Sequence, residues 1–141
     1  MLEINDLFRR IRNIPQYIKS DGTISSAIYL DSNGVSVDAD DKRILDEIIK
    51  DEERLHYFYN QGRTEDELKG PYKLAMIASV DKNSCVEKNI HIEPSPIEGE
   101  NPYHVLLKRS ESQIPLSGSQ RKHLQKNTKI VKKYDIDVVK E

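Results

Sequence analysis

The pair Asn33-Gly34 constrains the fold of this chain more than any other short feature. Both residue types tolerate a positive φ, and an Asn-Gly pair between two strand-like runs is among the strongest short signals for a β-hairpin. The run TISSAIYL at 23–30 has partly apolar residues on both faces of an extended chain, and VSVD follows at 35–38. We therefore expect two adjacent strands, 23–30 and 35–38, joined by a turn over 31–34.

Three further runs predict strands. YKLAMIASV at 72–80 is typical of a buried strand, and CVEKNIHI at 85–92 follows it after a turn, so the two predict a second hairpin. YHVLLK at 103–108 predicts another strand after a loop that contains prolines. Near the start of the chain, the apolar spacing of 2–12 fits a short helix, whereas Leu7–Ile11 also fits a strand.

Residues 40–59 are the most clearly helical stretch of the sequence. Their apolar stripe repeats every three or four residues and consists of Ile44, Leu45, Ile48, Ile49 and Leu55. Asp40 and Asp41 suit the positive N-terminal end of such a helix. Thr64 followed by Glu67 matches the capping-box pattern and predicts a further short helical turn.

Towards the end of the chain, 120–127 predicts a basic helix with Ser117 or Ser119 as its N-cap, and 130–141 predicts a last strand or a frayed tail. The strands follow one another in hairpins and do not alternate with helices. We therefore expect an α+β fold, a mostly antiparallel sheet of about five strands with two or three helices. The length of 141 residues suits a single domain covering 1–141.

Cysteine content and hydropathy indicate the compartment. Cys85 is the single cysteine, which excludes an internal disulfide and favours a reducing environment. The first residues lack the apolar core of a signal peptide, and no segment reaches the roughly 18 apolar residues of a membrane helix. Hydrophobic residues make up 36% and charged residues 33%, which predicts a modest core inside a charged exterior. We expect a soluble cytoplasmic protein with no membrane partner.

Charge is divided along the chain although the formal net charge is only −2. Residues 31–69 hold twelve acidic and six basic residues, whereas 105–133 hold eight basic residues and one acidic residue. The two segments either neutralise each other across the fold or leave a basic surface that contacts phosphate groups. The residues predicted to bind at such a surface are Arg9, Arg10, Arg121, Lys122, Lys126 and Lys129.

The usual motifs of metal and nucleotide sites are absent from the sequence. No pair of histidines or cysteines has the spacing of a zinc site, and no Walker loop or dinucleotide-binding glycine loop occurs. We predict no cofactor and no metal site, with one alternative left open, a hard cation held by Asp31 and Asp38. Cys85 has no activating neighbours in the sequence, which predicts an inert thiol.

His104 is the histidine placed best for chemistry. It follows Asn101-Pro102-Tyr103 and opens the predicted strand 103–108, so a rigid strand would hold it beside a loop. A histidine that only satisfies local hydrogen bonds is the alternative. Ser26 and Asp38, from the predicted hairpin, are the residues that we expect to act with His104 as catalytic groups.

Several motifs occur in a fixed order within residues 9–124, namely DGTISSAIYL, VSVD and NPYH. This order resembles a family of small uncharacterised bacterial proteins with the pattern Asp-Gly-x-x-Ser-Ser-x-x-Phe, then Ser-Val-Asp and Asn-Pro-x-His. Tyr29 stands here where the pattern has Phe. The resemblance implies a shared fold but no established activity. It also implies that some of its residues cluster, namely Ser25, Ser26, Ser36, Asp38 and His104.

Three functions are consistent with these features. The first is a non-catalytic binding module that contacts a protein partner, with the divided charge steering the encounter. The second is a nucleic-acid-associated protein that uses the basic segment 108–133, where sparse aromatic residues favour phosphate contact over base stacking. The third is a transferase or hydrolase for a nucleotide-like substrate, with His104 as acid/base and an arginine holding phosphate. The sequence leaves open whether the protein is an enzyme and predicts no oligomeric state.

Overall fold

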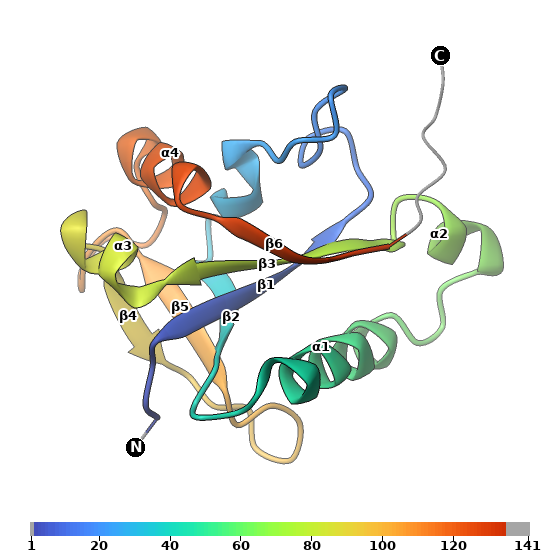
Figure 1. Cartoon of the computed structure of the whole chain (residues 1–141), viewed down its shortest axis with the longest axis horizontal. Coiled ribbons are helices and arrows are strands. Elements are labelled where there is room, and N and C mark those ends of the chain that lie inside the picture. Colours follow the sequence, from blue (N-terminus) through green and yellow to red (C-terminus); the bar gives the residue numbers. More distant parts are fainter. Residues whose placement is uncertain (1, 135–141) are drawn as a thin grey trace.

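The middle of the molecule is an antiparallel β-sheet (Figure 1). The computed structural model describes residues 2–134, and within them the strands are β1 (Asp6–Arg12), β2 (Val35–Ala39), β3 (Leu74–Asp81), β4 (His91–Pro94), β5 (His104–Lys108) and β6 (Lys129–Lys133). Their order across the sheet is β4-β5-β2-β1-β3-β6. The predicted α+β class with an antiparallel sheet is therefore confirmed, with one strand more than expected.

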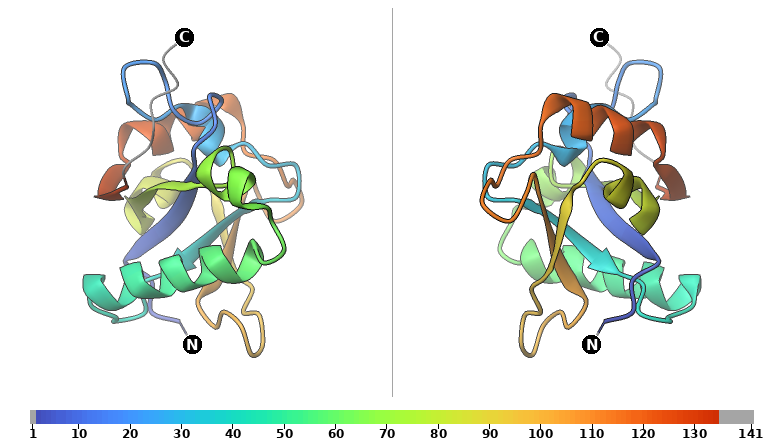
Figure 2. Two further views of the ribbon diagram at one scale, coloured as in Figure 1. Left: turned by 90° about the vertical axis from the view of Figure 1, so that its right-hand side faces the viewer. Right: turned by 90° about the vertical axis from the view of Figure 1, so that its left-hand side faces the viewer.

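Helices cover both faces of this sheet. In residues 2–134 they are α1 (Leu45–Tyr59), α2 (Glu65–Lys69), α3 (Lys82–Glu87), α4 (Gly118–Lys126) and the 3₁₀ helix η1 (Ser26–Tyr29). α1 lies along one face, while α4 and η1 lie on the other (Figures 1 and 2). None of the helices in this described part of the chain is long and apolar enough to cross a bilayer.

Two hydrophobic cores lie on the two faces of the sheet. The larger core fills the space between the strands and the layer of η1 and α4. Its bulkiest fully buried members are Leu7, Ile11, Ile28, Tyr29, Leu107, Leu116 and Leu124. The smaller core lies under α1 and consists of Phe8, Ile48, Leu74 and Ile77. Because this second core is small, part of the α1 face of the sheet carries polar side chains instead.

The predicted hairpin of 23–30 with 35–38 is wrong. η1 occupies half of the first segment, and β2 pairs with β1 and β5, not with that segment. The hydroxyl of Ser25 accepts a hydrogen bond from the amide of Ala27 at 2.9 Å and so caps η1. Serine side chains that satisfy nearby amides in this way favour turns over strand ladders.

The turn predicted over 31–34 does form. Asp31 accepts a hydrogen bond on Oδ1 from the amide of Asn33 at 2.8 Å, as in an Asx turn. Gly34 has a φ of +92°, a conformation that side chains disfavour. The Asn-Gly signal was therefore correct for the local backbone and wrong for the strand partners on either side.

The second predicted hairpin, 72–80 with 85–92, is also wrong. The first segment forms β3, but α3 follows directly, capped by Asp81, which accepts from the amide of Ser84 at 2.7 Å. β4 begins only at His91 and pairs with β5. An Asp three residues before a capped amide is a helix-start signal that outweighs the weak alternation of the segment.

The sequence signals for helices were more reliable than those for strand pairing. α1 is confirmed, although it begins at Leu45 and not at residue 40, and both Thr64 and Ser117 form complete capping boxes. Of the alternatives for the first residues, the strand is correct, since β1 covers Asp6–Arg12. In the predicted last segment 130–141, β6 accounts for the residues up to Lys133, and 135–141 lie outside the described residues.

Candidate functional site

Arg10 connects β1 to β2 and α1 through a single nitrogen. Its Nη1 donates to Asp38 Oδ2 at 3.3 Å and to Glu52 Oε2 at 3.0 Å. The two acidic side chains are 4% and 2% exposed, whereas that of Arg10 is 21% exposed. The cluster is therefore a buried polar group on the α1 face of the sheet that reaches solvent through its guanidinium.

The surroundings of Glu52 favour its protonated form. Burial raises its pKa well above the ordinary value, and Asp38 raises it further through a hydrogen bond and through charge repulsion. Arg10 and Arg43 lower the pKa, but by less. Oε1 of Glu52 is buried and has no hydrogen-bond partner among the described residues. A neutral carboxyl group leaves this oxygen with a smaller desolvation cost than a carboxylate does, in agreement with the raised pKa.

The loop 95–103 closes the cluster from the side of β5. Asn101 is 1% exposed and donates from Nδ2 to Oδ1 of Asp38. The hydroxyl of Tyr59, at the end of α1, donates to a carboxylate oxygen of Glu100 at 3.3 Å. The loop is therefore fastened both to the buried aspartate and to the helix above it.

Ser36 and His104 are hydrogen-bonded across β2 and β5. His104 Nε2 lies 3.1 Å from Ser36 Oγ, and His104 Nδ1 lies 2.8 Å from the carbonyl oxygen of Ser95. A carbonyl can only accept, so the proton of the neutral imidazole is on Nδ1 and Nε2 accepts from the Ser36 hydroxyl. His104 is also the cross-strand partner of Asp38, which places these side chains on one face of the sheet.

Ser26 lies elsewhere. It is the first residue of η1, which packs with α4 over the larger core, on the opposite face from the Arg10 cluster (Figure 2). Ser25 caps the same helix. Of the predicted catalytic set, the structure therefore brings together Asp38 and His104 and places Ser26 elsewhere. Of the cluster that the resemblance implies, Ser36 also lies beside His104, whereas Ser25 does not.

Arg9 and Arg121 are predicted binding residues that support the fold. Arg9 Nε donates to the carbonyl of Ile28 and Arg9 Nη1 to that of Ser36, both at 2.7 Å. Arg121 Nη1 donates to the carbonyl of Leu116 at 2.8 Å. These guanidinium groups satisfy backbone oxygens, as Arg10 satisfies carboxyl groups, so their charge is directed inward.

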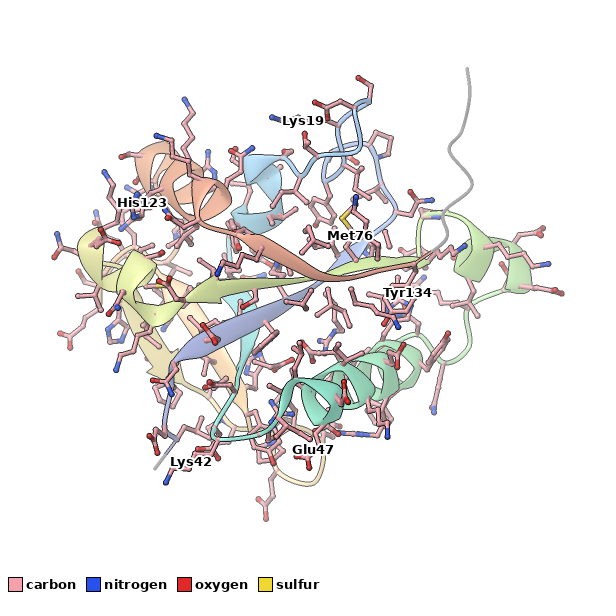
Figure 3. The ribbon with its side chains drawn as sticks, viewed as in Figure 1. Lys19, Lys42, Glu47, Met76, His123 and Tyr134 are labelled. Atoms are coloured by element: carbon pink, nitrogen blue, oxygen red, sulfur yellow. The ribbon has the colours of Figure 1, made fainter. Side chains whose placement is uncertain are left out.

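Within residues 2–134, no ion pair joins the acidic segment 31–69 to the basic segment 105–133. Lys108 pairs with Glu93, and His123 lies 3.6 Å from Glu87. The exposed lysines of α4 and β6, none of which pairs with an acid in the described part of the chain, are Lys122, Lys126, Lys129, Lys132 and Lys133. Figure 3 places Glu47 on α1 and His123 on α4, on opposite sides of the sheet. Although β2 and β5 bring parts of the two segments together, the segments do not neutralise each other through ion pairs among the described residues.

Strand register divides the lysines of β6 between the two sides of the sheet edge. Lys133 pairs with Met76, which belongs to the larger core, so Lys133 is on the α4 side. Lys132 pairs with Ile77 of the smaller core, so it is on the α1 side. Lys129 lowers the pKa of Asp6 electrostatically, so part of its positive charge is directed at this acid. We call the α4 and β6 lysines together the lysine surface; it wraps around the edge of the sheet.

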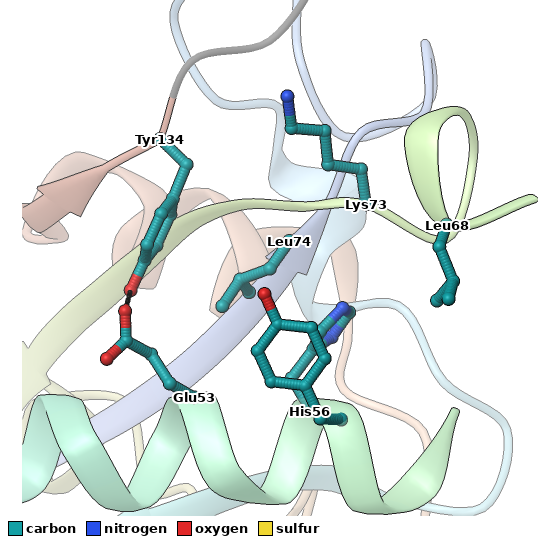
Figure 4. A pocket seen from close by; sticks show the side chains of 7 residues that line it. Glu53, His56, Leu68, Lys73, Leu74 and Tyr134 are labelled. Carbon is teal, nitrogen blue, oxygen red and sulfur yellow. Dashed lines mark hydrogen bonds between the residues drawn. The ribbon is translucent and has the colours of Figure 1, made fainter. Parts of the chain in front are cut away.

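A small pocket of about 140 Å³ lies between α1, α2 and the start of β3 (Figure 4). Its lining includes His56, Leu74 and the pair formed by Glu53 and Tyr134, in which the phenol donates to the carboxylate at 2.6 Å. Burial, followed by this carboxylate, raises the pKa of Tyr134. Ligand pockets are usually about 300–1,000 Å³, so this one is too small to hold a typical substrate.

Metal-binding and thiol chemistry find no support in the described residues. No group of three or more His, Cys, Asp or Glu side chains in residues 2–134 is arranged to hold a metal ion. Asp31 accepts from the turn amide of Asn33, and Asp38 is bonded to Arg10, so the two aspartates serve separate structures. Cys85 is buried, and burial raises its pKa to about 12, so its thiol is protonated at neutral pH.

Sequence reasoning did not single out Glu52, although a signal was present. Glu52 falls on the same helical stripe as Ile48 and Leu55, with a spacing of three and four residues, and all three are 2% exposed. An acid on an apolar stripe predicts a buried partner.

Comparisons of the chain with protein-family models, with curated proteins and with solved structures found no match.

Proposed function

We propose that this protein is a small binding module that contacts the phosphate backbone of a nucleic acid through the lysine surface of α4 and β6. The observation that supports the proposal most directly is that these lysines are exposed and pair with no acid in the described part of the chain. Unpaired lysines attract phosphate groups and release the counterions that surround them.

The composition of the lysine surface favours contact without sequence recognition. Reading bases requires aromatic side chains for stacking or planar donors for base edges. Tyr134 lies nearest in the sequence, but its hydroxyl is bonded to Glu53. Arg121, the arginine of α4, is bonded to a backbone carbonyl. Lysine ammonium groups remain, and they bind phosphate as point charges with little geometric selectivity.

The shape of the lysine surface suits an extended polyanion. Lys122 and Lys126 are spaced four residues apart on α4, so they lie on one side of that helix. Lys132 and Lys133 lie on the two sides of the neighbouring sheet edge. A flexible phosphate chain that follows the edge can contact both groups, whereas a compact phosphate compound contacts one.

The test is nucleic-acid affinity at two salt concentrations, measured by fluorescence anisotropy with a labelled single strand and a labelled duplex. The double variant Lys122→Glu/Lys126→Glu should bind more weakly, and its salt dependence should lose a slope of about one for each phosphate contact removed. The matched control is Lys19→Glu/Lys50→Glu, which changes the net charge equally at exposed lysines outside the lysine surface. The control should bind as the unmodified protein does.

A polyglutamate chain of similar charge separates nucleic acid from an acidic protein partner. If polyglutamate binds to the lysine surface and nucleic acids do not, the partner is an acidic protein and the nucleic-acid proposal is wrong. If both double variants lose affinity equally, net charge and not the lysine surface controls binding, and the proposal is also wrong.

A further inference from the structure

The bonds among Ser36, His104 and the Ser95 carbonyl have the geometry of an activated nucleophile. A hydroxyl lies within hydrogen-bond reach of an imidazole nitrogen, at 3.1 Å, and a third group orients the ring from its other nitrogen, at 2.8 Å. The amide of Ser95 also donates to the carbonyl of His104 at 2.8 Å, so the orienting residue is fixed at two points. Ser36 and His104 are both partly exposed.

We infer that Ser36 and His104 form a nucleophile and general-base pair for acyl transfer, with an uncharged carboxylic ester or a related acyl compound as the substrate class. Both side chains project from adjacent strands of the sheet, β2 and β5, which hold reacting groups more rigidly than loops do. This inference goes beyond the binding function and does not depend on it.

The reaction proceeds by proton transfer to His104. As Ser36 Oγ attacks the carbonyl carbon, its proton moves to His104 Nε2, a carbon–oxygen bond forms, and the carbonyl electron pair moves onto its oxygen. The tetrahedral species then collapses, the bond to the leaving alkoxide breaks, and the alkoxide takes the proton from Nε2. Water attacks the acyl-serine through the same two steps, which releases the acid and restores the Ser36 hydroxyl.

The charges around the pair favour an uncharged substrate over a phosphate ester. Arg10, the cation of this cluster, is already bonded to Asp38 and to Glu52. A phosphate would therefore meet a guanidinium whose charge is balanced by Asp38. A nucleotide-like substrate, which the sequence suggested, is less well suited to this face than an ester.

The Ser36–His104 pair is separate from the lysine surface. β5 and β2 occupy one half of the sheet, and β6 is the edge strand of the other half. Loss of acyl chemistry and loss of nucleic-acid binding are therefore independent results, because the variants that test them lie on β2 and β5 in one case and on α4 in the other.

A structural role is the competing explanation for the same hydrogen bonds. His104 connects β2 to the start of the loop that follows β4, which would stabilise the sheet without any chemistry. The two explanations differ in one measurable property, since only an activated serine reacts with an electrophile faster than other serines do.

The test is covalent labelling of the full-length protein with an alkyl fluorophosphonate. Attack by Ser36 Oγ forms an oxygen–phosphorus bond, the phosphorus–fluorine bond breaks, fluoride leaves and His104 takes the proton. We expect one adduct by intact mass and its location at Ser36 by peptide mapping. Ser36→Ala should abolish this adduct, and His104→Gln should slow labelling by roughly 100-fold or more.

Two controls keep the result interpretable. Ser26→Ala, on the other face of the sheet, should label at the unmodified rate. Circular dichroism of His104→Gln shows whether that variant is folded. A folded unmodified protein that is not labelled at Ser36, or labelling at Ser36 that is unchanged in folded His104→Gln, would overturn the inference.

Discussion

Asp38 of β2 and Glu52 of α1 accept hydrogen bonds from the same nitrogen, Nη1 of Arg10, at 3.3 Å and 3.0 Å. Two buried carboxyl groups thus face one cation. Ionising both would leave an unbalanced charge in a poorly solvated place, which costs several kcal/mol. Burial and the neighbouring Asp38 raise the pKa of Glu52 well above its ordinary value, which favours the protonated form of this carboxyl group.

This arrangement predicts that Glu52→Gln stabilises the protein as the pH rises. A carboxyl group whose pKa is higher in the folded state than in the unfolded state does not reduce stability at a pH below its unfolded pKa. As the pH rises from the unfolded pKa towards the folded pKa, the unfolded chain loses the proton first, so the folded state loses stability. The slope for one proton is at most about 1.4 kcal/mol per pH unit. A glutamine side chain does not titrate, so the variant should gain stability relative to the unmodified protein between pH 4.5 and pH 7.5, on the order of 1–2 kcal/mol.

Urea unfolding at these two pH values measures the effect. Glu47→Gln, at an exposed position of the same helix, is the matched control and should show no such gain. If Glu52→Gln is less stable than the unmodified protein at pH 7.5, then Glu52 is ionised and pairs with Arg10 as a full charge, and the protonated state is wrong.

Arg9 supports a second prediction, because its guanidinium donates hydrogen bonds where the backbone pairing of β1 with β2 ends. The register of β1 with β2 covers Leu7 and Phe8, and beyond it Arg9 donates to the Ser36 carbonyl in place of a backbone amide. Arg9→Met leaves two carbonyl oxygens without a donor, and each such loss costs about 1–3 kcal/mol. We expect a loss of roughly 2–4 kcal/mol in the free energy of unfolding.

Arg54→Met is the comparison for this loss. Arg54 is 54% exposed, so its removal should change stability by less than about 1 kcal/mol. Urea midpoints of the two variants measure the difference directly. Equal midpoints would mean that solvent replaces the donors of Arg9 at no cost.

The sequence predicted most reliably the helix caps and the turn, which depend only on residues close together in the chain. Thr64 forms the expected capping box with Glu67, and Ser117, one of the two expected N-caps, is bonded to Gln120 over the same spacing of three residues. Asn33-Gly34 likewise forms its turn. In each case the interacting atoms are neighbours in the chain, so residue types and spacing define the structure.

The choice of strand partners could not be predicted in this way. β2 pairs with β1 and β5, which are separated from it by tens of residues, and the same short-range signals are compatible with a hairpin. The contacts within the candidate sites could not be predicted from short-range signals either. Arg9 and Arg10 are adjacent and both basic, yet alternation along β1 sends one to backbone carbonyls near η1 and the other to carboxyl groups under α1.

Tyr29 supports a prediction at alkaline pH. Its hydroxyl lies 2.6 Å from Thr128 Oγ1, and Thr128 Oγ1 donates to the carbonyl of Leu124, so Tyr29 is the donor in the first bond. Burial raises the pKa of Tyr29 from 10.0 to about 12. The stabilising contribution is therefore complete below pH 10 and is lost as the pH rises from about 10 to 12, because the unfolded state releases its proton first.

Tyr29→Phe removes both the hydrogen bond and the titration. At pH 8 the variant should be about 1 kcal/mol less stable, as expected for one buried hydrogen bond. Because a phenylalanine side chain cannot ionise, this deficit should shrink by at most about 1.4 kcal/mol per pH unit between pH 10 and 12. Thermal unfolding of the two proteins across this range is the measurement, and the other tyrosines contribute equally to both. A deficit that stays constant from pH 8 to 12 would show that the Tyr29 hydroxyl ionises as easily in the folded state as in the unfolded chain.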